Sequence, residues 1–324
     1  MKANFSLIEQ AQLRLGSFVR KTPLLHAEPL DLIAGRRVFI KAECLQITGA
    51  FKIRGAWSAI SALPKDVRRH GVVTCSSGNH AQGIAYAARE HGIPAVVFMP
   101  SNAPSSKLDQ TRAYGADVRL FDRATQLGEP LAEAFATQHG LTLISAFDDP
   151  YVIAGQGSVG LELADQIYDQ NVSASEVLTC CGGGGLTSGI ALALEERAPH
   201  LTCRTVEPEG FDDTARSLLA GTIRTNTRTE GSICDSVLSQ QPGSLTFPVM
   251  KRLCGAGLVV TEEECLRAMG MAFRHLKVVI EPGGAIALAA ALYHGDALDT
   301  EDVVVIASGG NVDADLFKQA LATL

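Results

Sequence analysis

Short apolar runs alternate with longer amphipathic segments along most of the chain. The runs are rich in β-branched residues and have the length of buried strands, whereas the segments between them repeat their apolar positions with helical spacing. Strands buried on both faces and alternating with helices indicate parallel sheets, so the sequence predicts an α/β fold. The predicted strands cover residues 71–75, 93–99, 117–121, 141–145, 176–181, 201–208 and 303–308.

The block at 72–148 repeats the strand–helix unit closely enough to form a compact domain of its own. We therefore expect a small domain at 72–148, inserted into a large, discontinuous domain made of residues 1–71 and 149–324. Ligands of parallel sheets bind at the carboxyl ends of the strands, where the chain enters the following helix. The chemistry is therefore expected in the loops at those ends.

Composition narrows the class of protein. Of the 324 residues, 46% are hydrophobic and 19% are charged, which is enough apolar material for a sizeable core. The formal net charge is −7 with acids and bases interspersed, which argues against nucleic acid as a partner. The eight cysteines form no CxxC pair, and the chain has neither a signal-peptide pattern nor an apolar run of membrane-spanning length. We expect a reduced, cytoplasmic protein that does not bind a membrane.

A lysine stands between two apolar residues in the stretch TGAFKIRGA at 48–56. Phe51 and Ile53 flank Lys52, in a segment otherwise built mainly of small and apolar residues. Removing water from an ammonium group lowers its pKa and frees the amine lone pair for nucleophilic attack. An ordinary surface lysine, with its stem lying on apolar neighbours, is the competing interpretation of this stretch taken alone.

Two glycine-rich stretches are candidates for binding phosphate. Gly182, Gly183, Gly184 and Gly185 lie between a predicted strand and a predicted helix, where exposed backbone N–H groups form an anion site. The stretch GQGSVG at 155–160 matches the dinucleotide pattern GxGxxG, but no strand precedes it. We interpret GQGSVG as a feature of helix packing, and a nicotinamide-dependent dehydrogenase stays the alternative from a different class of function.

The loop CSSGNHAQG carries a cluster of polar side chains at the end of another predicted strand. Ser76, Ser77 and Asn79 can cap the following helix or bind a ligand carboxylate. His80 could be a general base, although a lone histidine in the first turn of a helix is more often structural. The chain has no GxSxG pattern, so a hydrolase triad has no support.

Two further strand ends carry polar groups. Ser308 ends the strand at 303–308, where its hydroxyl could meet a ring nitrogen or belong to an ordinary glycine turn. The acidic residues of VEPEGFDD at 206–213 could ligate a hard divalent cation through oxygen or stay solvated, and spacing alone favours the solvated state.

A lysine in an apolar setting, a phosphate cradle, a carboxylate-binding loop and a hydroxyl at a strand end together match the needs of pyridoxal phosphate. The chain closely resembles the fold-type II pyridoxal-phosphate enzymes, in the branch of the serine/threonine dehydratases and serine racemases. The resemblance implies two parallel-sheet domains of the tryptophan synthase β-like type, with the cofactor in the cleft between them, and a homodimer. The motifs that carry it occur in family order: KTPLL, TGAFKIRGA, SSGNHAQG, DPYVIAGQG, CGGGGL, VEPEG, EPGGA and SGGNVD.

The resemblance also implies roles for the motif residues. Lys52 would bind pyridoxal 5'-phosphate covalently and serve in catalysis, Phe51 would pack on the cofactor ring, and Asn79 would bond the phenolic oxygen. The glycines at 182–185 would hold the phosphate, and Ser308 would contact the pyridine nitrogen. The loop that would bind the substrate carboxylate contains Ser76, Ser77, Asn79 and His80.

The family's activating-cation site changes the interpretation of the acidic cluster. Glu207, the backbone carbonyl of Phe211 and Asp213 match the spacing of that site. The resemblance therefore implies a bound Mg²⁺, Ca²⁺ or Mn²⁺ ion, each of which suits oxygen ligands.

The implied reaction is β-elimination from a small amino acid. An ammonia-lyase of this kind dehydrates and deaminates a β-hydroxy amino acid (3-hydroxyaspartate, L-threonine or L-serine) to a keto acid and ammonia. Ser77 occupies the place of the second base in racemases, so a serine or aspartate racemase is the alternative. A second substrate carboxylate would need a cation, and Arg54, Lys107 and Arg123 are candidates by position.

Two departures from the family pattern bear on substrate preference. Ala50 stands where the family usually has serine, and Ser145-Ala146 replaces a frequent His-Pro. A non-catalytic binding protein of the same fold would not need a reactive lysine, so Lys52 counts against that possibility.

Overall fold

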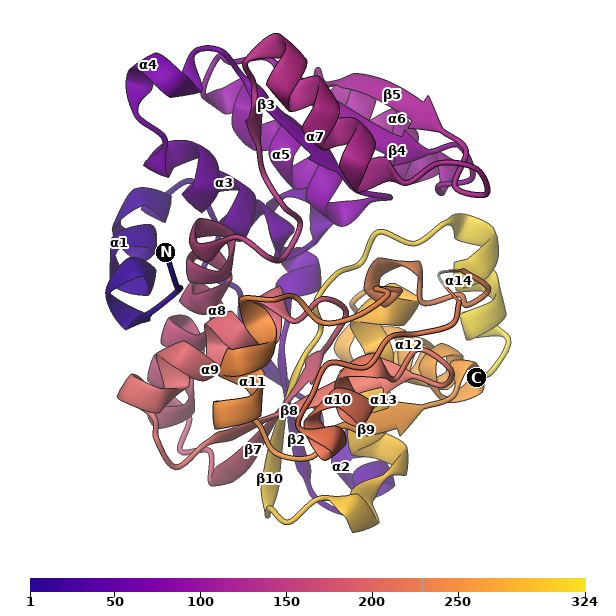
Figure 1. Ribbon diagram of the computed structural model, residues 1–324. Helices are drawn as coiled ribbons and strands as arrows, with labels where there is room; N and C mark the ends of the chain where they lie inside the picture. Colours follow the sequence, from indigo (N-terminus) through magenta and orange to yellow (C-terminus); the bar gives the residue numbers. More distant parts are fainter. Residues whose placement is uncertain (229) are drawn as a thin grey trace.

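Two sheets form the frame of the protein in the computed structural model, which describes residues 1–228 and 230–324 (Figure 1). The larger sheet has the strand order β1-β2-β10-β7-β8-β9, and the smaller sheet has the order β5-β4-β3-β6. The larger sheet contains β1 (Leu24–His26), β2 (Arg37–Lys41), β7 (Ala174–Cys180), β8 (Thr202–Pro208), β9 (Leu258–Val260) and β10 (Asp302–Ile306). The smaller sheet contains β3 (Val72–Cys75), β4 (Ala95–Pro100), β5 (Asp117–Phe121) and β6 (Thr142–Leu143).

The predicted parallel sheets are confirmed, with one exception. Among the paired strands, β1 alone runs antiparallel to its neighbour, β2. An antiparallel edge strand on an otherwise parallel sheet is common in α/β folds.

Helices connect most of the strands and cover both sheets. Those before the smaller sheet and within it are α1 (Phe5–Leu15), α2 (Glu28–Ala34), α3 (Lys52–Ala62), α4 (Lys65–Arg68), α5 (Asn79–Glu90), α6 (Ser105–Ala113) and α7 (Gly128–His139). The later ones are α8 (Pro150–Asp169), α9 (Gly185–Arg197), α10 (Asp213–Ala220), α11 (Thr246–Leu253), α12 (Glu262–Leu276), α13 (Pro282–Tyr293) and α14 (Ala314–Leu321). Short 3₁₀ turns are η1 (Glu43–Leu45), η2 (Ile47–Gly49), η3 (Asp235–Val237) and η4 (Gly295–Ala297).

The larger sheet is buried on both faces, as its continuous apolar strands predict. On β10, Val303 and Val305 pack toward α12 and α13, whereas Val304 and Ile306 pack toward α8 and α9. Alternation of side chains between the two faces of a strand explains why four consecutive apolar residues are needed here. Most of α13 is buried around its full circumference, which accounts for its lack of a polar face.

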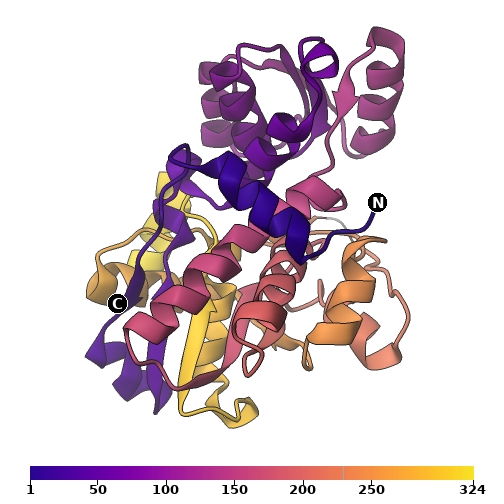
Figure 2. The ribbon, with the colours of Figure 1, turned by 90° about the vertical axis from the view of Figure 1, so that its left-hand side faces the viewer.

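The smaller sheet is made by the chain between β2 and β7. α7 covers one face of it, and α5 and α6 cover the other. The smaller sheet lies above the larger in Figure 1, and Figure 2 shows the same arrangement from the side, with α1 packed on α8. The domain boundaries at 71/72 and 148/149 stay a prediction.

Loops from both sheets meet between them. Ala50, shortly after β2, forms a β-bridge with Gly309, shortly after β10. Asn79, which follows β3, shares a hydrogen bond with Glu281 at the start of α13. The carboxyl ends of β2, β3 and β10 thus converge on one region, as expected for parallel α/β sheets. In the part of the chain that the structure describes, no helix is long and apolar enough to cross a membrane.

Candidate active site

Lys52 is the first residue of α3 and lies where the two sheets face each other. The Phe51 N–H donates to the Ser308 carbonyl at 3.1 Å, which ties the start of α3 to the loop after β10. The Lys52 Nζ donates to the Ala146 carbonyl oxygen at 2.7 Å. Burial lowers the pKa of Lys52 to about 8. At mildly alkaline pH a large fraction of this amine is therefore uncharged and nucleophilic, as the apolar setting predicts.

The glycines at 182–185 connect β7 to α9. Among the described residues, none of their four backbone N–H groups has a hydrogen-bond acceptor in the protein. Gly184 has a φ of 88°, a backbone conformation that favours glycine. The Gly183 carbonyl accepts from the Thr246 hydroxyl at 2.6 Å and from the Gly243 N–H at 3.1 Å, so it is held by the protein. Free N–H groups at the N-terminus of a long helix fit the phosphate of a cofactor.

Phe147 explains part of the need for glycine in this loop, and the sequence did not single it out. A Cβ on Gly183 would lie 2.3 Å from carbon atoms of the Phe147 ring. Phe147 directly follows Ala146, whose carbonyl holds the lysine amine. One short segment therefore contacts both Lys52 and the glycine loop.

Asn79 lies at the centre of a polar cluster between the sheets. Its Nδ2 donates to Glu281 Oε1, and its Oδ1 accepts from Asn311 Nδ2 at 2.9 Å. The other carboxylate oxygen of Glu281 accepts from Lys107 Nζ at 2.9 Å, and Asp235 binds the same ammonium at 3.0 Å. Burial lowers the pKa of Lys107, but the two carboxylates outweigh burial and raise it overall. Lys107 is thus a charged link from α6 to the larger sheet's side of the cleft.

Glu281 and Asn311 are site residues that the sequence analysis did not name. Both belong to motifs that the resemblance quoted, EPGGA and SGGNVD. An acid directly before a proline that opens an apolar helix was the available signal for Glu281, because a carboxylate buried at that place needs a partner.

Ser308 lies where predicted, at the carboxyl end of β10. Its side chain is buried, and its backbone carbonyl holds the start of α3. Cys180, at the end of the adjacent strand β7, contacts the Ile306 carbonyl two residues before it. A neutral hydroxyl is therefore the group that this strand end offers to a ligand ring.

The loop at 76–80 has a mixed character. The Ser76 hydroxyl accepts from the Gly78 N–H at 3.2 Å, and Ser77 is partly exposed. His80 is buried, and neither ring nitrogen has a hydrogen-bond partner among the described residues. Burial, and secondarily the charge of Lys52, lower the pKa of His80 to about 3. His80 is therefore uncharged at neutral pH and supplies no cation for a substrate carboxylate.

Glu207 and Asp213 are buried together at the N-terminus of α10. The Glu207 carboxylate accepts from the backbone N–H groups of Thr214 and Ala215 at 2.8 and 2.7 Å. Asp213 accepts from Asn226 with one oxygen, while its other buried oxygen, Oδ2, has no partner among the described residues. Burial raises the pKa of Asp213 to about 7 and raises that of Glu207 as well.

Phe211 is buried in the same loop, between the two acids in the chain. Its N–H donates to the Pro208 carbonyl at 3.0 Å, which closes the turn after β8. Within residues 1–228 and 230–324, no three His, Cys, Asp or Glu side chains form a group that could hold a metal ion. A cation here would thus need the Phe211 carbonyl or water in addition to the two carboxylates.

Comparison with known proteins decides the family. The sequence pattern of the family described as "Pyridoxal-phosphate dependent enzyme" matches residues 15–309. This chain belongs to that family. The membership agrees with the geometry, since the buried lysine, the free N–H groups and the hydroxyl at a strand end fit the amine-, phosphate- and nitrogen-binding needs of pyridoxal phosphate.

Similar members of the family differ in their named activities. A serine racemase of rice (Oryza sativa subsp. indica) is 39% identical over 98% of this chain and 94% of the relative. An L-threo-3-hydroxyaspartate ammonia-lyase of Pseudomonas sp is 39% identical over 96% of each chain. The crystal structure of a threonine deaminase from T.th. is 41% identical and covers 96% of this chain and 99% of its own, with a TM-score of 0.89. The fold-type II assignment from sequence is confirmed.

Proposed function

We propose that this chain is a pyridoxal-phosphate-dependent ammonia-lyase that converts a β-hydroxy amino acid to a keto acid and ammonia. The observation that carries the proposal is the buried Lys52 amine, with its pKa lowered to about 8, held at the Ala146 carbonyl beside the glycine loop. Two of the similar proteins are named for lyase or deaminase activity on hydroxy amino acids, which supports this reaction class.

The residues divide the work of the reaction. When bound, pyridoxal phosphate draws electrons from the substrate and so makes the α-proton acidic. Lys52 would hold the cofactor and, once free, would take the α-proton with its uncharged amine. The N–H groups at 182–185 would bind the phosphate, Phe51 would pack on the ring, and Asn79 and Ser308 would bond the ring's polar atoms. The Ser76–Ser77 hydroxyls would bind the substrate carboxylate.

A racemase is the second candidate, and one observation favours it. Ser77 is partly exposed in the loop after β3, so its hydroxyl is free to give a proton to the α-carbon. A relative with 39% identity is named as a serine racemase. Return of a proton to the opposite face, instead of loss of the β-hydroxyl, would invert the amino acid.

The substrate's β-substituent is tied to the available cations. Arg54 is bound by Glu43 and Glu162, and Lys107 is bound by Glu281 and Asp235. Arg123, in the loop after β5, is the remaining one of the three candidates for a second substrate carboxylate. L-Serine and L-threonine need no such cation, whereas 3-hydroxyaspartate does.

The test is the visible spectrum of the purified protein before and after addition of L-serine, L-threonine or 3-hydroxyaspartate, with keto acid assayed alongside. We expect a yellow protein whose band shifts with one substrate class as keto acid accumulates. Recovery of inverted amino acid without keto acid would assign a racemase instead. A protein that stays colourless with added pyridoxal phosphate would refute both activities.

We also propose that Glu207, Asp213 and the Phe211 carbonyl bind a divalent cation such as Mg²⁺, Ca²⁺ or Mn²⁺. The support is geometric: the Asp213 Oδ2 is buried without a partner among the described residues, and oxygen ligands suit these hard cations.

Mg²⁺ is expected to raise the melting temperature of the protein, and chelation is expected to lower it. A ligand present at 100 times its Kd stabilises the folded state by about 2.7 kcal/mol. Thermal unfolding of Asp213→Asn should show no Mg²⁺ response. Asp212→Asn is the matched control, because Asp212 pairs with Arg216 at the surface and should keep the response. Equal responses in both variants would place the cation elsewhere.

A homodimer in the cytoplasm completes the proposal. All eight cysteines are free, which suits a reducing compartment. Sedimentation of the purified protein at several concentrations measures its oligomeric state directly.

A further inference from the structure

The helix turn that carries Lys52 is packed between two other helices at glycines. A Cβ on Gly83 of α5 would lie 3.2 Å from the Lys52 carbonyl group. A Cβ on Gly155 of α8 would lie 2.4 Å from the Arg54 carbonyl oxygen and 2.7 Å from the Gly55 Cα. Side chains at these glycines would push the helices apart, so the backbone of the lysine turn is held directly on both sides.

α8 also touches the helix that begins at the glycine loop. A Cβ on Gly157 would lie 2.9 Å from the Gly189 carbonyl oxygen, and one on Gly160 would lie 2.8 Å from the Ala193 Cβ. Gly189 and Ala193 belong to α9, which starts at Gly185. The stretch GQGSVG is thus a helix-packing feature, as the sequence predicted, and it joins the helix of Lys52 to the helix of the glycine loop.

Gln156 completes the first turn of α3 with a hydrogen bond. The Phe51 carbonyl, which would ordinarily accept from the Gly55 N–H, accepts from the Arg54 N–H at 2.9 Å. The Gly55 N–H donates instead to Gln156 Oε1 at 3.1 Å. Phe51 has no side-chain cap to offer, so the partner of this turn comes from α8.

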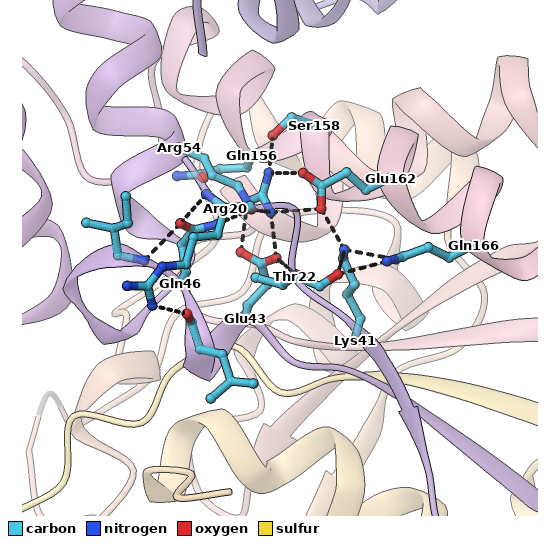
Figure 3. A network of polar contacts seen from close by, with 12 residues as sticks. Arg20, Thr22, Lys41, Glu43, Gln46, Arg54, Gln156, Ser158, Glu162 and Gln166 are labelled. Carbon is cyan, nitrogen blue, oxygen red and sulfur yellow. Dashed lines mark hydrogen bonds and ion pairs between the residues drawn. The ribbon is translucent and has the colours of Figure 1, made fainter. Parts of the chain in front are cut away.

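Arg54 adds a second connection from the same turn to α8 (Figure 3). Its guanidinium group is buried and binds both oxygens of Glu162, at 2.7 and 3.0 Å. Glu43 binds it from the side of β2, at 2.8 Å to each oxygen. The Ser158 hydroxyl accepts from it at 3.0 Å. Lys41 Nζ donates to Glu162 at 2.6 Å, so the cluster holds two cations and two anions.

We propose that Gln156 and Glu162 of α8 are positioning residues that fix the lysine turn relative to the glycine loop. Gln156 binds the turn's backbone, Glu162 binds its Arg54 side chain, and the glycines of α8 set the spacing to α9. The amine of Lys52 then meets a cofactor whose phosphate is bound at the start of α9. This inference rests on the proposed role of Lys52 and assigns a function to a helix that contributes no reacting group.

Gln156→Met and Gln166→Met form a matched pair for the test. Each replacement removes one buried carboxamide from α8. Gln166 accepts from Lys41 Nζ at 2.9 Å and donates to the Thr22 carbonyl at 2.8 Å, without bonding α3. We expect both variants to melt at a lower temperature than the parent protein. Only Gln156→Met should lose kcat, by roughly 10- to 100-fold, because small misplacements of reacting groups cost about that much. KM should change less than twofold.

The apoprotein gives a readout that does not need turnover. Pyridoxal, which lacks the phosphate, is added, the product is trapped with borohydride, and modification of Lys52 is followed by mass spectrometry. Trapping at Lys52 should be slower in Gln156→Met than in Gln166→Met and the parent. Gln156→Glu keeps an acceptor oxygen for the Gly55 N–H and should recover part of the rate.

The outcomes separate this inference from the proposed function. If Gln156→Met keeps the parent's kcat and trapping rate, or if Gln166→Met loses as much, α8 has no positioning role beyond stability. If Gln156→Met does not fold, Gln156→Asn, whose shorter side chain cannot reach Gly55, is measured in its place against the same two expectations. If the parent protein itself is not trapped at Lys52, the proposed role of the lysine fails, and this inference fails with it.

Discussion

Replacing Lys52 with alanine is expected to abolish the yellow band of the protein and to lower the rate of keto acid formation by at least about 10³-fold, within the range for loss of an acid–base group. Both effects have one cause, because the same amine would hold the cofactor and take the α-proton. The measurement is the absorption spectrum and the keto acid assay on protein reconstituted with pyridoxal phosphate. Lys65→Ala is the control, since Lys65 is exposed at the start of α4.

The same lysine predicts a pH dependence. Burial lowers the pKa of Lys52 to about 8, so its nucleophilic, uncharged form grows as the pH rises and becomes the majority above that value. Borohydride trapping of pyridoxal on the apoprotein at Lys52 should therefore rise between pH 7 and 9 and level off. An ordinary exposed lysine would still be gaining reactivity at about pH 10.4. A midpoint at that higher value, or an unchanged band in Lys52→Ala, would contradict the assignment.

Arg54→Met is expected to destabilise the protein by about 3–5 kcal/mol, because removal of one partner leaves buried charges uncompensated. Arg54 is inaccessible to solvent, and the carboxylates of Glu43 and Glu162 would lose their shared cation. Lys41 would remain near Glu162 but does not replace the bonds to Glu43. The free energy of unfolding from urea denaturation measures the effect.

Arg197→Met is the control for this substitution. Arg197 pairs with Asp165 on the protein surface, where both side chains are about half exposed, and its loss should change stability by less than about 0.5 kcal/mol. Equal losses in the two variants would mean that the buried cluster contributes no more than a surface ion pair.

The elements that were predictable from sequence are those with uninterrupted apolar character. β5 was predicted at 117–121 and is observed there, and β8 and β10 differ from their predictions by one or two residues at an end. β1, β2 and β9 were not predicted. β1 and β9 have three residues each, too few for a periodic pattern, and they exist because neighbouring strands offer free edges.

The site was predictable as a set of loops but not as a set of contacts. Lys52, Ser308 and the glycine loop could be identified because each combines a special residue type with a strand end. The bonds of Asn79 with Glu281 and Asn311 join residues more than 200 positions apart, and no local pattern encodes them. The Ala146 carbonyl was equally hidden, since every residue has a backbone carbonyl and the fold alone decides which one meets the lysine.

The place of β10 in the larger sheet has a consequence for protein synthesis. β10 pairs with β2 on one side and β7 on the other, so it joins two parts of the sheet that otherwise do not touch. β2 leaves the ribosome hundreds of residues before its partner, and such distant pairings make folding slow. The start of α3 likewise waits for the Ser308 carbonyl. A nascent chain would therefore hold Lys52 in place only when synthesis is nearly complete, and until then its β2 edge would depend on chaperones for protection.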